Sequence, residues 1–519
     1  MRDGDEKSID LADFDVDSVR NFSIIAHIDH GKSTLADRLL EITGVISKEK
    51  KNAQVLDKLP VERQRGITVK AQTASMFYEK DGKKYLINLI DTPGHVDFSY
   101  EVSRSLAACQ GTVLLVDAAQ GIQAQTVANF YLAFSQGLKV IPVLNKVDLP
   151  GAEPERVEKQ MHTAFEFEQN RFLRISAKSG SNVEQVLEKV VDEIPHPIGN
   201  RDLPLRSLLF DSWYDTYAGV ICLISIVDGS IKKGDKIMSA HTGVKYEVSQ
   251  VGIMSPGMKK TQALYAGQVG YFVCNMKSIS EAYIGDTFHL VKQPVSPFEG
   301  FKQPKPMVFA GLFPSDSNDF EKLQDAINQL TLNDSSVTVN KETSNALGQG
   351  WRLGFLGTLH MDVFRQRLEE EYDVSVIISH PTVPYKVTLT NGTEQLVKSP
   401  ADFPDKVKLG YNIEKISEPY YYRGSLNSHT YIDESRVIIS ARLPSSEIVT
   451  DFYDKLKSHS SGFASLDYED SGYETADLVK MEVLLNNEPV DALAAVMHRS
   501  RVETNGRDIA KRLKDLIKR

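Results

Sequence analysis

The 519-residue sequence has only three cysteines, two tryptophans and no long uninterrupted apolar run. The cysteines, Cys109, Cys222 and Cys274, are odd in number and far apart. They therefore predict buried thiols in a reducing compartment rather than a disulfide framework or a metal site. Because no stretch approaches the roughly 18 apolar residues of a membrane-spanning helix, any membrane association is expected to be peripheral.

An excess of positive charge is also missing. The chain has 60 Lys and Arg against 70 Asp and Glu, a formal net charge of −10, which argues against a protein that simply coats nucleic acid. A local basic face would still be enough to bind a ribosome. Residues 499–519 are locally basic, although a solvated helix face is the simpler interpretation. The basic residues there are Arg499, Arg501, Arg507, Lys511, Arg512, Lys514, Lys518 and Arg519.

The first 20 residues lack both common targeting patterns. They contain seven acidic and three basic residues, whereas a mitochondrial presequence is rich in Arg and poor in acids, and a secretory signal has an apolar core. We interpret residues 1–20 as an acidic N-terminal extension.

Residues 21–199 alternate short apolar runs with amphipathic stretches. This alternation predicts an α/β domain whose mostly parallel sheet is covered by helices on both faces. The expected strands are 22–26, 85–90, 112–116, 139–144 and 172–175, and the expected helices are 33–43, 100–108, 123–136, 153–166 and 183–193.

The remaining residues predict further domains, consistent with the three or four expected from the chain length. Short β-rich runs and turns predict an antiparallel β-barrel over residues 200–295. The pattern after a proline-rich joint predicts a ferredoxin-like βαββαβ unit over residues 303–384. Residues 385–519 are expected to form an incomplete α+β domain that ends in a basic helix. Its expected strands are 437–441 and 479–485, and its expected helices are 446–458 and 507–517.

A phosphate-binding loop follows the first expected strand. The run from Ala26 to Thr34 is a P-loop in which Ala26 replaces the usual first glycine. Its backbone N–H groups can surround phosphates, Lys32 would bridge the β- and γ-phosphates, and the Ser33 hydroxyl would ligate Mg²⁺. Taken alone, the motif could be a Gly-Lys-Ser turn at the start of any helix. The residues predicted to contact nucleotide here are Ala26, His27, Ile28, Asp29, His30, Gly31, Lys32, Ser33 and Thr34.

Two further motifs are typical of loops that sense the γ-phosphate. Thr68 follows a polar stretch, 48–70, that is expected to be mobile, and it could complete the Mg²⁺ shell only while a γ-phosphate is bound. The run Asp91-Thr92-Pro93-Gly94-His95 follows an apolar strand. Asp91 suits a water-mediated Mg²⁺ contact and the Gly94 amide suits the γ-phosphate. His95 would then orient the attacking water as the catalytic residue, with a structural histidine as the alternative.

The run Asn145-Lys146-Val147-Asp148 ends the expected strand 139–144 and predicts guanine recognition. The Asp148 carboxylate can accept hydrogen bonds from both the ring N–H and the exocyclic amine of guanine. Adenine lacks this donor pair, so an ATP-driven enzyme is disfavoured. Lys146 would stack along the base and Asn145 would brace the loop.

The run Ser176-Ala177-Lys178 supplies a second expected guanine contact. All five motifs occur in order at strand or loop positions that an open α/β sheet uses for its ligand. Together they predict a GTPase that binds GTP or GDP with Mg²⁺.

Several longer runs resemble elongation factor 4, the LepA-type translational GTPase. They are residues 21–34, 91–105 and 353–361, and residues 66–78 and 121–134 are similar to its mitochondrial branch. The resemblance implies a ribosome-dependent GTPase that acts as an elongation fidelity factor and moves a ribosome back one step after defective translocation. It further implies a monomer that contacts rRNA, tRNA and the factor-binding site of the ribosome. The implied location is the mitochondrial matrix, peripherally on the inner membrane, and the acidic N-terminus leaves the cytoplasm as the alternative.

The chain departs from the family pattern in two places. The first strand and helix of a second ferredoxin-like domain, which begins near residues 417–420 in the family, are missing here. The family also continues past residue 519 into a basic domain expected to reach toward tRNA. These departures suggest an alternative function, a GTP-binding, ribosome-associated module that lacks tRNA-remodelling activity because of truncation.

Overall fold

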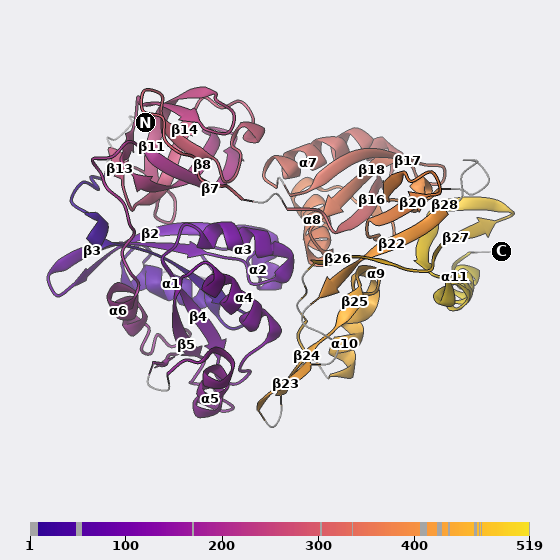
Figure 1. Cartoon of the computed structure of the whole chain (residues 1–519), viewed down its shortest axis with the longest axis horizontal. Helices are drawn as coiled ribbons and strands as arrows, with labels where there is room; N and C mark the ends of the chain where they lie inside the picture. The colour runs from indigo at the N-terminus through magenta and orange to yellow at the C-terminus, as the bar shows by residue number, and fades with distance from the viewer. Residues whose placement is uncertain are drawn as a thin grey trace. The chain divides into compact units, whose positions relative to one another are not determined.

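The computed structural model shows two compact units, drawn in Figure 1. The first comprises residues 1–303 with the short segment 432–435, and the second comprises 304–431 and 436–519. Positions 1–8, 48–53 and 423–427 and the basic residues 518 and 519, which entered the sequence predictions, lie outside the described residues. The structure describes residues 9–47, 54–168, 171–301, 304–334, 336–404, 413–422, 428–433, 436–460, 464–466, 468 and 470–517.

The first unit contains a six-stranded sheet with the order β2-β3-β1-β4-β5-β6. Strand β2 is antiparallel to β3, and all other neighbours are parallel. The sheet confirms the mostly parallel α/β fold predicted from the sequence. The strands are β1 (Val19–Ala26), β2 (Gln72–Lys80), β3 (Lys83–Asp91), β4 (Gly111–Asp117), β5 (Lys139–Asn145) and β6 (Leu173–Arg174).

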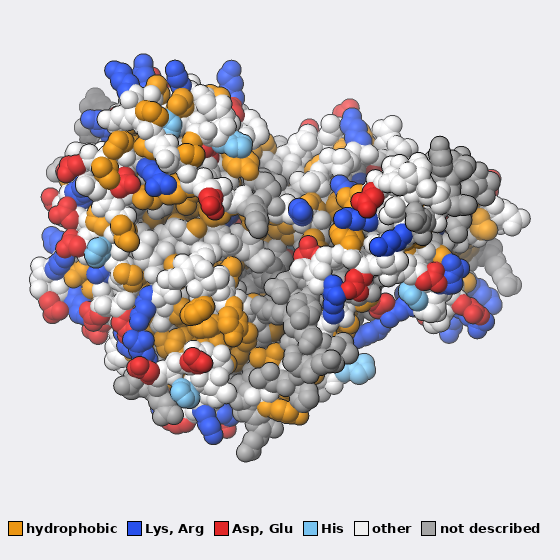
Figure 2. Space-filling model, in the orientation of Figure 1, with side chains coloured by type: hydrophobic (Ala, Val, Ile, Leu, Met, Phe, Trp, Pro, Cys, Tyr) orange, Lys and Arg blue, Asp and Glu red, His pale blue; other side chains and the backbone are white. Residues whose placement is uncertain are grey.

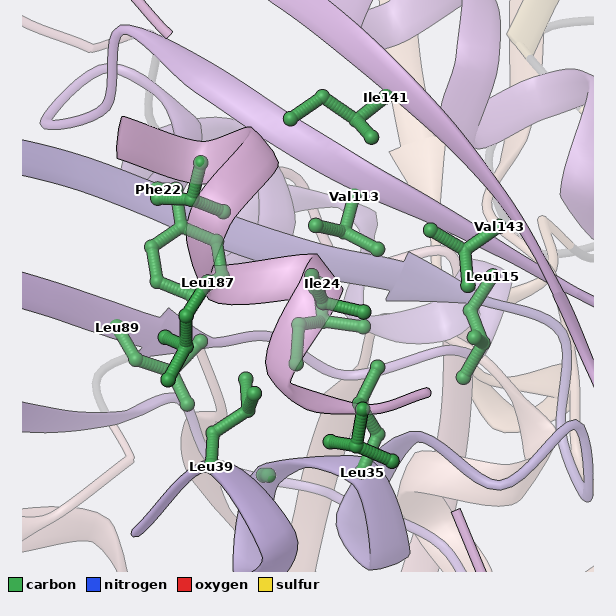
Figure 3. Packing of buried hydrophobic residues seen from close by; sticks show 14 of the residues in the cluster. Phe22, Ile24, Leu35, Leu39, Leu89, Val113, Leu115, Ile141, Val143 and Leu187 are labelled. Atoms are coloured by element: carbon green, nitrogen blue, oxygen red, sulfur yellow. The ribbon is translucent and has the colours of Figure 1, made fainter. Parts of the chain in front are cut away.

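Helices cover both faces of this sheet because side chains alternate along its strands. Phe22 and Ile24 of β1 pack with α1 and α6 (Figure 3), whereas Ile25 packs with α3, α4 and α5 on the opposite face. These two apolar layers hold the carboxyl ends of the strands at one edge. The helices are α1 (Lys32–Ile42), α2 (Pro60–Arg65), α3 (Ser99–Leu106), α4 (Ala124–Ser135), α5 (Pro154–Phe165) and α6 (Glu184–Glu193).

Strand β2 and helix α2 were not predicted. Strand β2 is polar at both ends and forms the edge of the sheet, joined to β3 by Asp81 and Gly82, which both have positive φ. An Asp-Gly pair between two strand-like runs is a hairpin signal that could have identified β2.

A closed antiparallel barrel follows, as predicted. Its main sheet has the order β10-β15-β7-β8-β14-β11-β12, and an additional β10–β11 pairing closes it. The N-terminal extension contributes to its core, because Leu11 and Phe14 are buried there and Gln268 Nε2 donates to the Leu11 carbonyl at 3.0 Å. The strands are β7 (Arg206–Asp215), β8 (Gly219–Asp228), β9 (Ser230–Lys232), β10 (Lys236–Ser239), β11 (Lys245–Met254), β12 (Met258–Lys260), β13 (Ala263–Tyr265), β14 (Val269–Cys274) and β15 (Thr287–Leu290).

The second unit begins with the predicted βαββαβ arrangement, whose antiparallel sheet has the order β17-β18-β16-β19. Helices α7 and α8 pack on one face, where Leu323 and Phe364 are buried with Leu353 of β18. The elements are β16 (Val308–Pro314), α7 (Phe320–Leu332), β17 (Thr338–Ser344), β18 (Gly348–Phe355), α8 (Thr358–Tyr372) and β19 (Val376–Ile378).

The rest of the second unit has more strands than the sequence predicted. Its five-stranded sheet shares a core with the βαββαβ unit through Tyr385 and Val387 of β20, and the separate β27–β28 pair joins that core through Val496. Beyond it, α10 follows a π-helical turn, and α11 begins at Val502 rather than near 507, so that Gly506 lies within the helix. The elements are β20 (Tyr385–Leu389), β21 (Glu394–Val397), β22 (Ile413–Tyr422), β23 (Ser428–Asp433), β24 (Arg436–Ser440), β25 (Arg442–Pro444), α9 (Ser445–Glu447), α10 (Tyr453–His459), β26 (Asp470–Thr475), β27 (Leu478–Leu485), β28 (Glu488–His498) and α11 (Val502–Leu516).

Among the described residues, no helix is both long and apolar enough to cross a bilayer.

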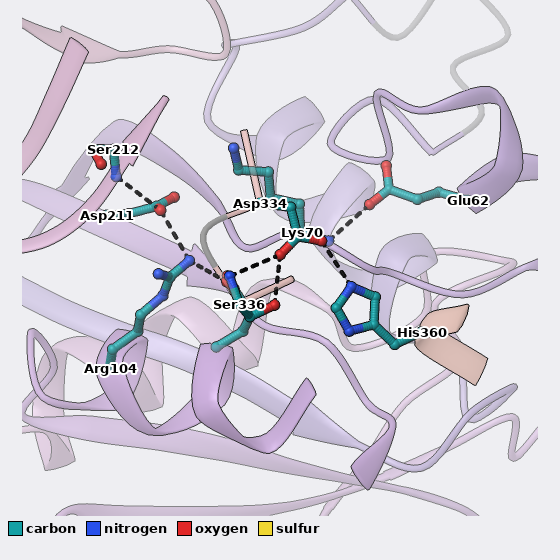
Figure 4. Close-up of polar contacts among 9 residues, drawn as sticks. Glu62, Lys70, Arg104, Asp211, Ser212, Asp334, Ser336 and His360 are labelled. Carbon is teal, nitrogen blue, oxygen red and sulfur yellow. Dashed lines mark hydrogen bonds and ion pairs between the residues drawn. The ribbon is translucent and has the colours of Figure 1, made fainter. Parts of the chain in front are cut away.

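A buried polar contact joins the start of α8 to the segment that follows α7 in the βαββαβ unit. The His360 imidazole lies 2.8 Å from Asp334 Oδ2 through its Nε2 and accepts the Leu356 N–H at 3.2 Å through Nδ1 (Figure 4). Although burial opposes it, His360 and Ser336 lower the pKa of Asp334 well below its usual range. His360 is 2 % exposed, so it has the structural role that its position at the start of α8 suggests.

We expect His360→Ala to destabilise the second unit by about 2 kcal/mol, because Asp334 would lose a charge-assisted hydrogen bond. Because the pKa of Asp334 is lowered in the folded state, this stabilisation is fully present above the ordinary pKa of Asp. It is lost as the pH falls from that value through the lowered pKa of Asp334. Urea unfolding at pH 7 measures the effect, with His459→Ala as an exposed-histidine control. Equal midpoints for the two variants would contradict the assignment.

Candidate nucleotide-binding site

The P-loop forms the floor of a cavity of about 240 Å³. Two left-handed residues turn the chain between β1 and α1, Asp29 with φ 64° and Gly31 with φ 94°. A Cβ at Gly31 would lie 2.4 Å from Asn145 Nδ2, so only glycine fits there. The cavity is lined by Ala26, His27, Ile28, Asp29, Gly31, Lys32, Ser33, Thr34, Gln54, Gly66, Ile67, Thr68, Gly94, His95 and Lys146.

His30 differs from the other predicted P-loop residues because its side chain packs beneath the loop. Its Nδ1 accepts the Asp117 N–H at 3.3 Å, and the ring is fully buried. Burial, together with the nearby His27, lowers the pKa of His30 to about 3. The ring is therefore neutral, and it supports the loop without adding charge to the cavity.

Lys32, Thr68 and Asp91 form one buried cluster although they are far apart in the sequence. Lys32 Nζ donates to both Asp91 carboxylate oxygens at 2.8 Å and to Thr68 Oγ1 at 2.6 Å. Thr68 in turn donates to Asp57 Oδ1 at 2.9 Å. Burial raises the pKa of Asp91 to about 6 against the opposing charge of Lys32. Three residues predicted to handle phosphate and Mg²⁺ thus meet, and Asp57 joins them unpredicted from within the polar stretch.

The residues at this cluster fit Mg²⁺. Ser33 lines the cavity, and Thr68 and Asp91 lie together at the Lys32 ammonium. Hydroxyl and carboxylate oxygens are the hard donors that Mg²⁺ prefers, completed in nucleotide sites by water and substrate phosphates. A cage of three or more His, Cys, Asp or Glu side chains does not occur in the described part of the chain, and such a nucleotide site does not require one.

The described part of the polar stretch, for which the sequence predicts mobility, makes hydrogen bonds to two carboxylates. The Glu62 carboxylate accepts the N–H groups of Leu59, Val69 and Lys70 at 2.8, 3.0 and 3.1 Å. Asp37 of α1 similarly accepts the Gln54 and Val55 amides at 2.7 and 2.9 Å. Burial raises the pKa of both carboxyls. These local hydrogen bonds satisfy backbone N–H groups of a segment whose polar composition predicts mobility.

His95 lies at the rim of the same cavity. Its Nδ1 accepts the Asp97 N–H at 3.1 Å, and the side chain is 19 % exposed. A Cβ at Gly94 would approach the Ala26 carbonyl to 3.0 Å, so glycine lets this loop lie against the P-loop. Thr92 Oγ1 donates to the Ile24 carbonyl at 3.1 Å, and Pro93 is buried.

Asn145 joins the P-loop to the second guanine-contact run, Ser176-Ala177-Lys178. Its Nδ2 donates to the His30 carbonyl at 2.9 Å, and its Oδ1 accepts the Ala177 N–H at 2.9 Å. The Val147 N–H donates to the Ile175 carbonyl at 3.3 Å, which ties the ends of β5 and β6 together. Through these two hydrogen bonds the Asn145 side chain connects the P-loop to the run 176–178.

The other members of these two runs differ in exposure. Lys146 has φ 62°, and its Nζ donates to the Asp29 carbonyl at 2.5 Å. Ser176 and Ala177 are buried, whereas Asp148 and Lys178 are exposed. The exposed carboxylate and ammonium are therefore open to solvent at the same edge of the sheet.

Asp117 is a site residue that the sequence reasoning missed. Its carboxylate lies 2.9 Å from Lys146 Nζ and accepts the N–H groups of Ala119 and Gln120 at 2.7 and 3.1 Å. Although burial opposes it, these contacts lower the pKa of Asp117. The sequence did contain a signal for this role. Asp117 is an acidic residue directly after the expected strand 112–116, at the sheet edge where the other motifs lie.

Comparisons with known proteins agree with this architecture. The family models that match are Elongation factor Tu GTP binding domain (residues 17–196), Elongation factor Tu domain 2 (219–289), Elongation Factor G, domain III (303–380) and Elongation factor G C-terminus (413–484).

Similar proteins occur across eukaryotes. The chain is 55% identical to Translation factor GUF1, mitochondrial, of Homo sapiens, over 99% of this chain and 80% of the relative. It is 54% identical to a Translation factor GUF1 homolog, mitochondrial, of Sorghum bicolor, over 98% and 80%. A crystal structure of a Thermus thermophilus protein has a TM-score of 0.60 at 18% identity, over 89% of this chain and 97% of that one, a likeness of fold alone.

We expect Asn145→Ala to weaken GDP binding about 30-fold, because two buried hydrogen bonds, each worth about 1 kcal/mol, would be lost. Titration with a fluorescent GDP analogue measures the change. The matched control is Asn182→Ala, which removes an exposed hydrogen bond to the Arg174 carbonyl. An affinity equal to that of the control would contradict the bracing role.

Proposed function

The chain belongs to the family of GUF1 translation factors, the elongation factor 4 type of translational GTPase, and we propose that its GTP hydrolysis depends on the ribosome. The observation that carries the proposal is the cluster at the cavity. Lys32 donates hydrogen bonds to both Thr68 and Asp91 there, and His95 lies at the rim of the same cavity. One cavity therefore brings together a phosphate-binding lysine, a γ-phosphate sensor and a residue able to orient water.

GTP would enter by exchanging the partners of Lys32. Its ammonium would leave the Asp91 carboxylate for the β- and γ-phosphate oxygens, while the P-loop N–H groups surround the phosphates. Ser33, Thr68 and, through water, Asp91 are the residues that would hold Mg²⁺, which would neutralise phosphate charge. His95 would orient the attacking water once its loop is held against the γ-phosphate.

Guanine would be recognised at the edge formed by β5 and β6. The exposed Asp148 carboxylate would accept the ring N–H and the exocyclic amine. Lys146, held by Asp117 and the Asp29 carbonyl, would stack along the base, and the loop of Ser176 and Lys178 would close over it. Asn145 would hold these loops together.

The proposed partner is a ribosome, contacted at its factor-binding site, rRNA and tRNA. Strands β9 to β12 carry exposed lysines, and Figure 2 shows Lys and Arg side chains gathered over the barrel. Such a local patch suits phosphate backbones despite the net charge of −10. These exposed lysines are Lys232, Lys236, Lys245, Lys259 and Lys260.

Domain roles and location follow from the same family membership. We assign nucleotide chemistry to residues 21–199 and ribosome contact to residues 200–295 and 303–384. We propose a monomeric factor in the mitochondrial matrix, peripheral on the inner membrane. The names of the relatives, which include the word mitochondrial, support the mitochondrial part of this proposal. We propose back-translocation of ribosomes after defective translocation as its cellular task.

We expect His95→Ala to lower ribosome-stimulated GTP hydrolysis by about 100-fold or more, because the attacking water would lose its orienting group. GDP affinity should be unchanged, since His95 lies at the γ-phosphate end. Phosphate release with and without ribosomes measures the effect, and His162→Ala on α5 is the control.

A natural sequence that binds GTP without stimulation by ribosomes would overturn the ribosome-dependent function. Stimulation without movement of tRNA would instead support a GTP-binding, ribosome-associated module that lacks remodelling activity. Toeprinting of the ribosome position on messenger RNA distinguishes this module from a back-translocating factor.

We expect Asp148→Asn to change base specificity rather than to abolish binding. Guanine would lose the carboxylate that accepts its two N–H donors, and GDP affinity should fall about 100-fold or more. Xanthine has a carbonyl in place of the amine, so an amide side chain suits it and XDP affinity should rise. Competition between GDP and XDP measures the exchange, and unchanged preference for GDP would contradict the role of Asp148.

A further inference from the structure

Strand β7 of the barrel contacts the GTPase domain through one face. A bulge between Leu209 and Asp211 shifts the register of β7 against β8, and such bulges redirect side chains. Beyond the bulge, Asp211 and Trp213 are two residues apart and so project from the same face. Their cross-strand partners, Leu223 and Ile221, lie in the apolar cluster that joins the barrel to the GTPase domain.

Asp211 forms a buried ion pair with helix α3. Arg104 Nη2 lies 3.0 Å from Asp211 Oδ1, and the same guanidinium pairs with Glu101. Asp211 also accepts the Ser212 N–H at 2.8 Å (Figure 4). Arg104 is 4 % exposed and Asp211 2 %. Neither charge can exchange its partner for water without separating the barrel from α3.

Trp213 contacts the segment that follows Thr68. The Lys70 ammonium lies 5.9 Å from the centroid of the Trp213 ring, within the range of a cation–π contact. The Lys70 N–H also donates to Glu62 (Figure 4). Because Lys70 lies two residues after Thr68, a movement of Thr68 would change the contact of Lys70 with the Trp213 ring.

An apolar contact completes the connection. Ile90, the residue before Asp91, is fully buried in a cluster with Phe210 of β7 and Tyr271 of β14. Helix α3 begins at Ser99, shortly after His95. The barrel thus touches the chain on both sides of the Asp91–His95 loop and just beyond Thr68.

We infer that β7 positions both nucleotide-sensing loops, with Asp211 as the positioning residue for the helix that follows His95. The ion pair and the Trp213 contact pass the nucleotide state to the barrel, and a barrel held by the ribosome aligns His95 in return. This coupling rests on the proposed ribosome-dependent hydrolysis. It adds a route by which binding at the barrel reaches the cavity.

The first test uses Trp213 as a reporter and needs no ribosome. The chain has two tryptophans, so Trp351→Phe, which keeps the ring stack on Phe320, leaves Trp213 alone. We expect Trp213 emission to differ between the GDP complex and the complex with a non-hydrolysable GTP analogue. Adding Lys70→Met should remove most of that difference. Identical emission in the two nucleotide states would overturn the inference.

The second test separates positioning from folding. Asp211→Asn should lower the ribosome-stimulated kcat about tenfold while the KM for ribosomes and the GDP affinity stay unchanged. The paired variant combines Arg104→Met with Asp211→Leu, and it adds Glu101→Met because the Glu101 carboxylate would otherwise lose its guanidinium partner. Apolar groups of similar size then replace all three charges, so this variant should keep the Tm yet show the same loss. The matched control is Asp192→Asn, which removes a carboxylate from an exposed pair with Lys80.

Three outcomes distinguish the explanations. A full ribosome-stimulated rate in Asp211→Asn would overturn the inference. Parallel losses of Tm, GDP affinity and kcat in both Asp211→Asn and the paired variant would assign Asp211 a merely structural role and overturn it as well. Absence of ribosome stimulation in the natural sequence would refute the proposed function, and the Trp213 emission would still decide whether β7 senses the nucleotide.

Discussion

The contact of the Lys32 ammonium with the Asp91 carboxylate is the interaction on which the site depends. Both groups are buried, and a buried charge is tolerated only when it is paired. The pair joins the start of α1 to the end of β3, and Thr68 brings in the segment after α2. Three segments that are distant in sequence are thereby held at one edge of the sheet. Phosphate oxygens are the natural replacement for Asp91 at Lys32, so the proposed entry of GTP would exchange the partners of Lys32.

This cluster is coupled to the barrel because the barrel packs where the loops begin and end. Ile90 precedes Asp91 and is buried among barrel residues, and Arg104 of α3 pairs with Asp211. The N-terminal extension strengthens the same joint, since Leu11 and Phe14 lie in the barrel core while Val19 begins β1. The barrel therefore contacts the GTPase domain on both sides of the Asp91–His95 loop. These contacts explain how a partner bound to the barrel would affect hydrolysis.

Sequence reasoning succeeded where a residue's role depends on its immediate neighbours. The parallel sheet, the barrel and the βαββαβ unit follow from local apolar periodicity, and the P-loop geometry follows from Gly31 and the helix behind it. It failed at β2, whose polar ends hide an edge strand. In residues 385–519 it identified β24, β27, α10 and α11 but missed other short strands, which obtain their stability from a core shared with the βαββαβ unit. The expected mobility of residues 48–70 stays a prediction. In the described part of that stretch, Asp37 and Glu62 accept hydrogen bonds that a polar composition does not reveal.

The sequence by itself determined the family, the GTPase chemistry and the identity of the residues around the cavity, because P-loops and guanine-contact motifs are short segments whose backbone conformation is encoded locally. Only the tertiary structure decided which side chains pair across those segments. Asp117 against Lys146, Asp57 against Thr68 and Asp211 against Arg104 are contacts between residues separated by many positions. Their strength comes from burial, and burial is a property of the packed domains rather than of any stretch of chain.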